Sequence, residues 1–205
     1  MPTFHLLAGP NGAGKSSLYR ALVAEDAINA QLEFVNADIY ERDHLKRIKN
    51  PLKRTEAARA WAEGRRSDLM KSKTSFVSET VFSHESKIKL IVDAKQAGYQ
   101  VLLYIVALDD PEKLIERVNN RVREGGHDVP TEKILSRYPR TLANLAKALP
   151  LADVAFLYDS QDNQQGGLQH VATCSKGVLI EGVESFPVWV RTVLGIWGLK
   201  AVFIA

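Results

Sequence analysis

The chain has 205 residues, of which 45% are hydrophobic and 25% are charged, and these proportions are typical of one globular α/β domain. Its formal net charge of +3 is small for this length, so the charge does not indicate a nucleic-acid-binding protein. The single cysteine, Cys174, cannot form an internal disulfide bond and no signal peptide opens the sequence, which together favour a reducing cytoplasm.

Five apolar runs predict buried parallel strands, and helical patterns fill the gaps between them. This alternation predicts a single α/β domain over residues 1–205, in which a parallel sheet carries helices on both faces. Ligands of such sheets collect at the carboxyl ends of the strands, so we expect the functional residues directly after each run. The runs are Thr3–Ala8, Leu32–Asn36, Ser75–Ser78, Val101–Leu108 and Val154–Tyr158.

A glycine-rich segment follows the first apolar run directly. Residues Gly9–Ser16 read Gly-Pro-Asn-Gly-Ala-Gly-Lys-Ser, which fits the phosphate-binding pattern G-x-x-x-x-G-K-[ST]. The glycines let successive backbone N–H groups face one anionic group, Lys15 can reach the terminal phosphates, and the Ser16 hydroxyl can bind Mg²⁺. The residues expected to contact ATP here are Gly9, Pro10, Asn11, Gly12, Ala13, Gly14, Lys15, Ser16 and Ser17.

A helix predicted from Ser16 to about Ala27 points its N-terminus at the same phosphates. The alternative is a glycine-rich turn with a chance Lys-Ser pair behind it. Because strand, loop and helix occur in the required order, the sequence favours binding of a nucleoside triphosphate.

Two carboxylates follow the next two predicted strands. Asp38, in Phe34-Val35-Asn36-Ala37-Asp38, can accept the proton of an attacking hydroxyl, or it can cap a helix that begins at Ile39. Glu79 ends the third run, where it can bind the hydroxyls of an acceptor, hold a water on Mg²⁺, or simply lie on the surface. Thr80 and Ser83 follow Glu79 and can share its pocket.

An arginine-rich segment follows the fourth predicted strand. A helix is predicted over Pro111–Glu124, a glycine pair ends it, and Pro130 with Thr131 begins the next helix. Two helices joined by a glycine hinge, at about residues 117–137, can form a lid that closes over the triphosphate and places guanidinium groups against the transferred phosphoryl group.

Some arginines of this segment are expected to act in catalysis or ATP binding, and others are expected only to face solvent. Arg117 and Arg121 are four residues apart and therefore share one helix face. Arg121 and Arg137 are the expected catalytic pair, and one or two of the five arginines are expected on an ordinary solvated helix face. Arg117 and Arg123 are expected to contact ATP, and Arg140 completes the group.

Three further segments carry weaker signals. The charged stretch Pro51–Lys73 predicts a solvated helical connection over the sheet. His127 lies in the lid, where a polar contact is favoured over a metal site because no second histidine or cysteine stands at ligand spacing. The segment Tyr158–Asn163 can hold a nucleotide base or form a polar surface turn.

The last part of the chain predicts a hairpin and a terminal helix. Leu168–Thr173 and Gly177–Glu181 resemble two short strands joined by a turn. The apolar segment Phe186–Ala205 is as long as a membrane span, but Arg191 and Lys200 interrupt it. It therefore predicts a helix packed on the sheet, with no membrane partner.

These residues together resemble the zeta-toxin family of P-loop kinases, in the short form without long extensions. The resemblance covers residues 4–160 and is most particular in the arginine-rich segment with its Gly-Gly-His-Asp-Val-Pro hinge. It implies a P-loop kinase-like fold, that is, a parallel sheet with helices on both faces and an arginine-rich helical lid. The matching segments are Gly9–Ser16, Phe34–Asp38, Ser78–Thr80 and Arg117–Pro130, continuing through Arg137-Tyr138 to Leu142–Leu145.

The resemblance also implies an activity, the Mg²⁺- and ATP-dependent phosphorylation of a UDP-activated amino sugar, typically UDP-N-acetylglucosamine on its 3′-hydroxyl. By position, Lys15 and Ser16 would hold phosphates and Mg²⁺, Asp38 would be the base, and Arg121 would steady the phosphoryl group. Glu79 matches a family carboxylate that binds the sugar. The residues expected to bind the acceptor are Asp38, Glu79 and Thr80.

Toxins of this family are often held inactive by an antitoxin, so the resemblance implies such a protein partner. Two other functions remain open. One is a kinase for a different acceptor, such as a nucleoside, a polynucleotide end or an antibiotic. The other is an ATP-binding regulatory module without turnover, whose lid would control a protein partner.

Overall fold

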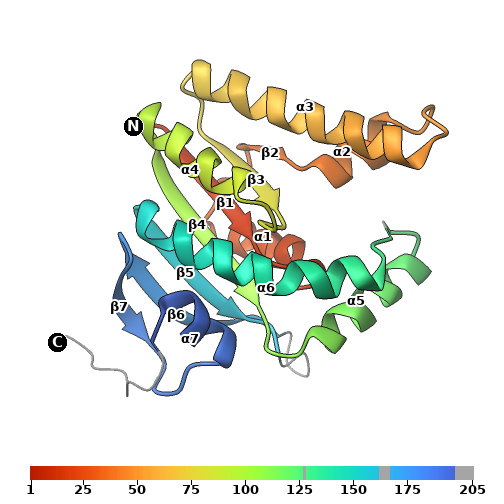
Figure 1. Ribbon diagram of the computed structural model, residues 1–205. Helices are drawn as coiled ribbons and strands as arrows, with labels where there is room; N and C mark the ends of the chain where they lie inside the picture. The colour runs from red at the N-terminus through yellow and green to blue at the C-terminus, as the bar shows by residue number, and fades with distance from the viewer. Residues whose placement is uncertain (127, 162–166, 197–205) are drawn as a thin grey trace.

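The computed structural model of the chain describes residues 1–126, 128–161 and 167–196. Within these residues the strands form one sheet in the order β2-β3-β1-β4-β5-β6-β7 (Figure 1). The strands β1 to β5 run parallel, whereas β6 and β7 are antiparallel, so both the predicted parallel sheet and the predicted hairpin are confirmed. Their bounds are β1 Thr3–Ala8, β2 Glu33–Val35, β3 Phe76–Thr80, β4 Gln100–Ala107, β5 Val154–Asp159, β6 Gln169–Ser175 and β7 Val178–Gly182.

Helices cover both faces of the sheet. Buried residues of α3, α4, α6 and α7 form one core cluster with the sheet, and buried residues of α1 and α5 form the other. Side chains alternate along β1, so Phe4 and Leu6 enter the first cluster and Leu7 enters the second. The helices are α1 Lys15–Ala24, α2 Ala37–His44, α3 Pro51–Lys71, α4 Ser86–Gln96, α5 Pro111–Arg123, α6 Thr131–Ala148 and α7 Val188–Leu194, with a 3₁₀ turn at Leu149–Leu151.

The predicted solvated connection over residues 51–73 is a helix, but it is not solvated all round. Ala58, Ala62 and Leu69 of α3 are buried, and so is the charged side chain of Arg66. The alanines are small enough to let the helix lie close to the sheet while charged residues cover its outer face. Because so many residues of α3 are charged, its narrow stripe of buried residues could not be recognised in the sequence.

The helix α7 occupies the beginning of the predicted terminal helix, and residues 197–205 of that prediction lie outside the described residues. Trp189 of α7 is 1% exposed and belongs to the core cluster on the same face as α6. No helix in the described part of the chain is long and apolar enough to cross a membrane.

A carboxylate from the end of β4 holds the N-terminus of α7. Asp109 accepts hydrogen bonds from the backbone N–H groups of Val188 at 2.9 Å and Trp189 at 2.7 Å. The indole N–H of Trp189 donates to Asp159 at 2.7 Å. Because Pro187 offers no side-chain cap, these two carboxylates supply the acceptors that attach α7 to the carboxyl edge of the sheet.

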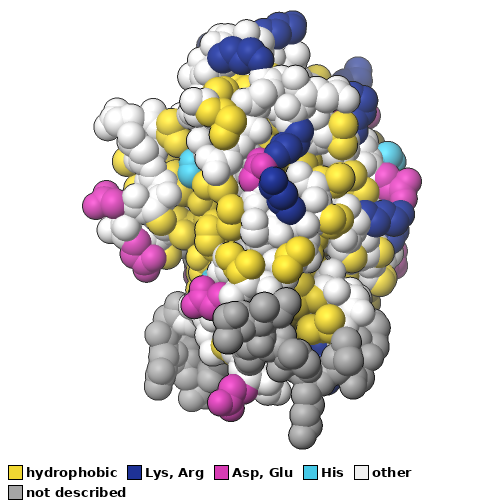
Figure 2. All heavy atoms as spheres, turned by 90° about the vertical axis from the view of Figure 1, so that its left-hand side faces the viewer, with side chains coloured by type: hydrophobic (Ala, Val, Ile, Leu, Met, Phe, Trp, Pro, Cys, Tyr) yellow, Lys and Arg dark blue, Asp and Glu magenta, His cyan; other side chains and the backbone are white. Residues whose placement is uncertain are grey.

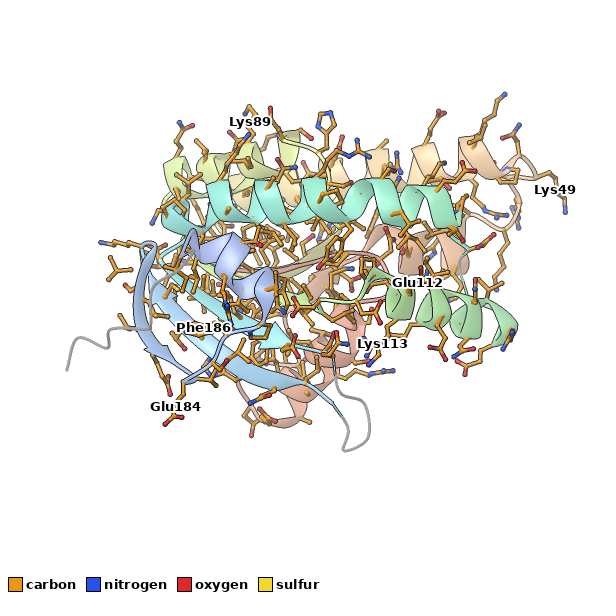
Figure 3. All side chains as sticks on the ribbon, turned by 60° about the horizontal axis from the view of Figure 1, so that its bottom comes forward. Lys49, Lys89, Glu112, Lys113, Glu184 and Phe186 are labelled. Atoms are coloured by element: carbon orange, nitrogen blue, oxygen red, sulfur yellow. The ribbon has the colours of Figure 1, made fainter. Side chains whose placement is uncertain are left out.

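We expect the substitution Asp109→Ala to lower the free energy of unfolding by about 1–2 kcal/mol, because the first N–H groups of α7 lose their acceptors. Urea unfolding measures this change, and Glu184→Ala is the control, since Glu184 is an exposed carboxylate just before α7 (Figure 3). Equal stability of the two variants would contradict the capping role of Asp109.

Candidate active site

The phosphate loop joins β1 to α1 at the carboxyl edge of the sheet and is pressed against two neighbouring backbones. A Cβ atom on Gly9 would lie 2.0 Å from the carbonyl oxygen of Val106 in β4. A Cβ atom on Gly12, whose φ is +80°, would lie 2.6 Å from the carbonyl oxygen of Leu114 in α5. Only glycine allows these approaches, so the loop keeps a concave run of backbone N–H groups suited to phosphate.

Lys15 is 6% exposed and sits inside the loop. Its ammonium donates to the carbonyl oxygens of Gly9 at 3.1 Å and Pro10 at 3.0 Å, and lies 3.9 Å from Glu79 Oε1. Burial lowers the pKa of Lys15, and the carboxylates of Glu79 and Asp38 oppose that shift. A buried cation with two carboxylates nearby therefore marks the centre of the site.

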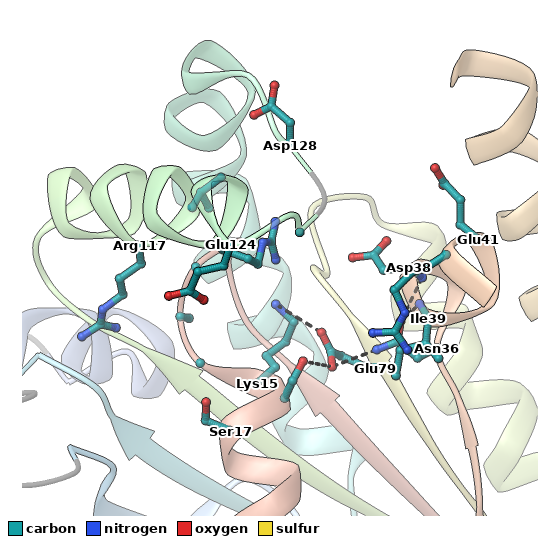
Figure 4. A pocket seen from close by; sticks show the side chains of 18 of the residues that line it. Lys15, Ser17, Asn36, Asp38, Ile39, Glu41, Glu79, Arg117, Glu124 and Asp128 are labelled. Carbon is teal, nitrogen blue, oxygen red and sulfur yellow. Dashed lines mark hydrogen bonds and ion pairs between the residues drawn. The ribbon is translucent and has the colours of Figure 1, made fainter. Parts of the chain in front are cut away.

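Glu79, at the end of β3, connects three elements of this site. Its Oε2 accepts hydrogen bonds from the Ser16 hydroxyl at 3.0 Å and from the side-chain amide of Asn36 at 3.1 Å (Figure 4). The parallel pairing of β1 with β3 places Glu79 beside Leu7, at the entrance to the phosphate loop. The Glu79 side chain is only 13% exposed, so the alternative of a surface glutamate is wrong.

Asp38 lies in the first turn of α2, and Asn36 rather than Asp38 caps that helix. The Asn36 Oδ1 accepts from the backbone N–H groups of Asp38 at 2.9 Å and Ile39 at 3.2 Å, which corrects the capping alternative for Asp38. The exposed Asp38 carboxylate lines the cavity over the phosphate loop (Figure 4). Burial lowers the pKa of Arg137, and the charge of Asp38 opposes this shift as it does for Lys15.

The arginines of α5 and α6 take different positions around the loop. Arg117 and Arg121 line the cavity, and the charge of Arg121 adds to the lowering of the Lys15 pKa that burial causes. Arg137 reaches the phosphate loop itself, where Nη1 donates to Asn11 Oδ1 at 3.4 Å. Arg123 is exposed and does not line the cavity. Both members of the predicted pair therefore lie near the phosphate loop: Arg121 lines the cavity, whereas Arg137 contacts Asn11 from outside the cavity lining.

The cavity over the phosphate loop has a volume of about 1190 Å³. At one end Arg117 donates from Nη1 to the Ser160 hydroxyl at 3.1 Å, and burial lowers the Arg117 pKa. Ser160 and Leu168 both line the cavity, and a Cβ atom on Gly14 would lie 3.9 Å from Leu168 Cδ2. The predicted base-binding segment therefore contributes Ser160, while its residues 162 and 163 lie outside the described residues.

At its other end the cavity extends over α2 and the start of α3. Its lining there includes the basic side chains of Arg42, Lys46 and Arg54, and Arg54 Nε lies 2.9 Å from the buried carboxylate of Glu41. None of these residues, nor Asn36, was predicted to contribute to the site. The Asx signal before α2 could have identified Asn36 as a cap, but its contact with Glu79 depends on strand pairing.

The predicted acceptor residue Thr80 does not line this cavity, and its hydroxyl accepts from the backbone N–H of Phe82 at 3.5 Å. Ser17 lines the cavity, and its hydroxyl accepts from Arg20 at 3.2 Å. His127, considered above as a lid residue, lies outside the described residues.

The oxygen donors of the loop fit a magnesium ion that is bound mainly through phosphates. Mg²⁺ in such sites takes one or two protein oxygens and completes its shell with water and phosphate. The Ser16 hydroxyl and the Glu79 carboxylate, 3.0 Å apart, offer that set. Within the described residues no group of three or more His, Cys, Asp or Glu side chains could hold a metal ion by itself.

The model of one protein family, the zeta toxins, matches residues 1–164 of this chain. The chain belongs to the zeta toxin family. This membership makes it an ATP-dependent kinase, and the phosphate loop at the carboxyl edge of the sheet agrees with a P-loop fold. No curated protein sequence matches the chain.

Solved structures with low sequence identity share the fold of this zeta toxin-family kinase. The PezAT toxin–antitoxin system of Streptococcus pneumoniae includes a chain with 18% identity and a TM-score of 0.63, over 84% of this chain and 72% of that one. A putative kinase from Chloroflexus aurantiacus has 17% identity and a TM-score of 0.61, over 80% and 91% of the two chains. The complex AvrRxo1-ORF1:ORF2 with ATP matches with 19% identity and a TM-score of 0.67, over 87% of this chain and 60% of that chain.

We expect Gly9→Ala to abolish nucleotide binding, because the new methyl group cannot share space with the Val106 carbonyl oxygen 2.0 Å away and must displace the loop. Gly64→Ala is the control: a Cβ there meets nothing within 4 Å, and the helix α3 should gain about 0.5–1 kcal/mol. Fluorescent ATP-analogue titration and thermal unfolding of both variants measure these effects. Normal nucleotide affinity in Gly9→Ala would contradict the tight packing of the loop.

Proposed function

We propose that this kinase transfers the γ-phosphoryl group of ATP to a hydroxyl of a UDP-activated amino sugar, such as UDP-N-acetylglucosamine, and that it is the toxin of a toxin–antitoxin pair. The observation that carries the kinase chemistry is the convergence of two carboxylates, Glu79 and Asp38, on the buried Lys15, with the Ser16 hydroxyl bonded to Glu79. These are a cation for phosphate, a donor set for Mg²⁺ and a carboxylate that can accept a proton.

The shape and charge of the cavity support an anionic acceptor. Its volume of about 1190 Å³ exceeds what one small ligand usually fills, so ATP and a second molecule have room together. Arg42, Lys46 and Arg54 line the end beyond Asp38, where the diphosphate of a nucleotide sugar would find cations. A neutral nucleoside or antibiotic has no group that these side chains would favour, whereas a polynucleotide end remains the competing anionic acceptor.

In the proposed reaction, the oxygen of the acceptor hydroxyl forms a bond to the γ-phosphorus of ATP while the bond from that phosphorus to the ADP oxygen breaks. Asp38 accepts the proton that the hydroxyl loses. Lys15, Arg121 and Arg137 stabilise the negative charge that spreads over the phosphoryl oxygens. Ser16 would hold Mg²⁺, with Glu79 on one of its waters, and the ion would supply charge neutralisation between the phosphates. At the other end, Arg117 and Ser160 would orient the base of ATP.

The proposal includes a protein antitoxin as partner. Among the structural neighbours, PezAT is a toxin–antitoxin system and AvrRxo1-ORF1 is paired with ORF2. An open cavity with charged walls would give such a partner a surface that also controls access to ATP.

We expect Asp38→Asn to lower phosphoryl transfer at least about 100-fold while ATP affinity is retained, because an amide of the same shape cannot take the proton. The assay incubates the protein with ATP, Mg²⁺ and a panel of UDP-sugars, nucleosides and oligonucleotides, and detects the gain of one phosphate by mass spectrometry. Asp68→Asn is the control, since Asp68 is an exposed residue of α3 that pairs with Lys71, and neither residue lines the catalytic cavity.

A phosphorylated UDP-amino sugar that disappears only with Asp38→Asn would support both the acceptor and the base. Phosphorylation of an oligonucleotide end instead would overturn the sugar acceptor and leave the kinase chemistry standing. Unchanged turnover in Asp38→Asn would remove Asp38 from the role of base.

We expect Arg137→Ala to lower kcat about 100-fold or more with a smaller change in the KM for ATP, because its guanidinium acts on charge that develops during transfer. Arg140→Ala is the matched control, since Arg140 is exposed one turn further along α6 and donates to the Ser136 carbonyl oxygen. Steady-state kinetics distinguish the two. An equal kcat in the two variants would show that Arg137 has no catalytic role.

A further inference from the structure

The helices α3 and α4 cover the same face of the sheet (Figure 1). A second cavity is lined by residues of both helices. Its volume is about 740 Å³, enough for a small organic molecule. None of its lining residues belongs to the cavity over the phosphate loop. We name it the α3–α4 groove; it is lined by Glu63, Arg66, Ser67, Met70, Lys71, Lys73, Ser86, Lys87, Lys89, Leu90, Asp93 and Ala97.

Arg66 is the unusual member of this lining. The residue is 7% exposed, its Nη1 makes one long hydrogen bond of 3.4 Å to the Ser78 hydroxyl, and its Nε has no partner among the described residues. Burial lowers the Arg66 pKa, opposed only by the charge of Glu63. A buried guanidinium with unfilled donors is costly, and an oxyanion that accepts from it would remove that cost.

The other cations of the groove differ from Arg66 because each has a local acceptor. Lys87 lies 3.5 Å from Glu63 and Lys89 lies 2.6 Å from Asp93. Even so, the lining holds five basic and two acidic side chains, an excess of three positive charges. Figure 2 shows Lys and Arg side chains gathered at the top of the molecule, where α3 lies.

We infer that the α3–α4 groove binds a small organic oxyanion, a carboxylate or phosphate monoester on an apolar body, with Arg66 as its anchor. Arg66 would donate to the oxyanion from the part of its guanidinium group that lines the groove. Lys87, at the rim, would exchange its contact with Glu63 for one with the oxyanion. The apolar body would lie on Met70, Leu90 and Ala97, which line the groove and pack against the core.

Binding in the α3–α4 groove is separate from the proposed kinase activity, but the groove is connected to the catalytic cavity through β3. Arg66 contacts Ser78, and the next residue of β3 is Glu79, whose side chain points to the opposite face and into the catalytic cavity. The two ligands would therefore lie on opposite faces of the sheet, and substitution of Arg66 distinguishes binding in the groove from binding in the catalytic cavity.

The test is isothermal titration calorimetry on the protein saturated with Mg²⁺ and a non-hydrolysable ATP analogue, so that the phosphate loop is occupied. Phenyl phosphate and phenylacetate are the probes, and benzyl alcohol and inorganic phosphate are the comparisons. We expect one additional site for at least one of the two aromatic anions, no heat with benzyl alcohol, and weaker binding of inorganic phosphate. The tighter aromatic anion identifies the ligand as a phosphate monoester or a carboxylate.

Arg66→Met should weaken this binding at least about tenfold, because it keeps the length of the side chain and removes the donors. Arg65→Met is the matched control, since Arg65 is the neighbour on α3 but pairs with Glu33 outside the groove. If Arg66→Met does not fold, Lys87→Met, at the rim, should still weaken binding several-fold.

The proposal has a second readout in the free protein. Arg66→Met removes a buried charge, so its melting temperature should equal or exceed that of the unsubstituted chain in the absence of any anion. Absence of binding by the unsubstituted protein at millimolar probe, or equal affinities in the Arg66→Met and Arg65→Met variants, would overturn the proposal. Equal affinities for inorganic phosphate and phenyl phosphate would overturn the part that concerns the apolar body.

Discussion

The close approach of the phosphate loop to β4 and α5 is the constraint on which the rest of the site depends. Gly9 touches the β4 backbone at Val106, and Gly12 touches the α5 backbone at Leu114. Because α5 is fixed against the loop at Leu114, the next turns of the helix place Arg117 and Arg121 along the cavity. The loop thus positions both the N–H groups that bind phosphate and the helix that carries guanidinium groups to it.

Charge within the site is arranged around Lys15. Its ammonium is buried against backbone carbonyl oxygens, and the nearby carboxylates oppose the lowering of its pKa that burial causes. Glu79 contacts Lys15, Ser16 and Asn36 together, which ties the loop, β3 and the start of α2 into one unit. The polar groups are therefore oriented before a nucleotide arrives, and little reorganisation is needed when charge develops on a transferred phosphoryl group.

The features that the sequence predicted are those with a local signal. Apolar runs located the strands, and the glycine pattern with its flanking strand and helix located the phosphate loop. Features that depend on distant residues were missed. Asp109 caps a helix that begins 79 residues later. Asn36, rather than Asp38, caps α2, and its side-chain amide also donates to Glu79. Arg66 is buried in α3, a helix that was predicted to be solvated because so many of its residues are charged.

The strand β3 shows how a chain with a small net charge can contain two sites suited to anions, the catalytic cavity and the α3–α4 groove. Its side chains alternate between faces, so Ser78 meets Arg66 beneath α3 while Glu79 meets the phosphate loop on the other side. The lining of the catalytic cavity holds seven basic and five acidic side chains, so carboxylates offset most of its cations, as suits a site that must also hold Mg²⁺ and take up a proton. In the α3–α4 groove the buried cation, Arg66, has no carboxylate in contact among the described residues, so an anion from outside the chain can meet its charge. The net charge of +3 is a sum over the whole chain, so it does not reveal where on the molecule the cations gather.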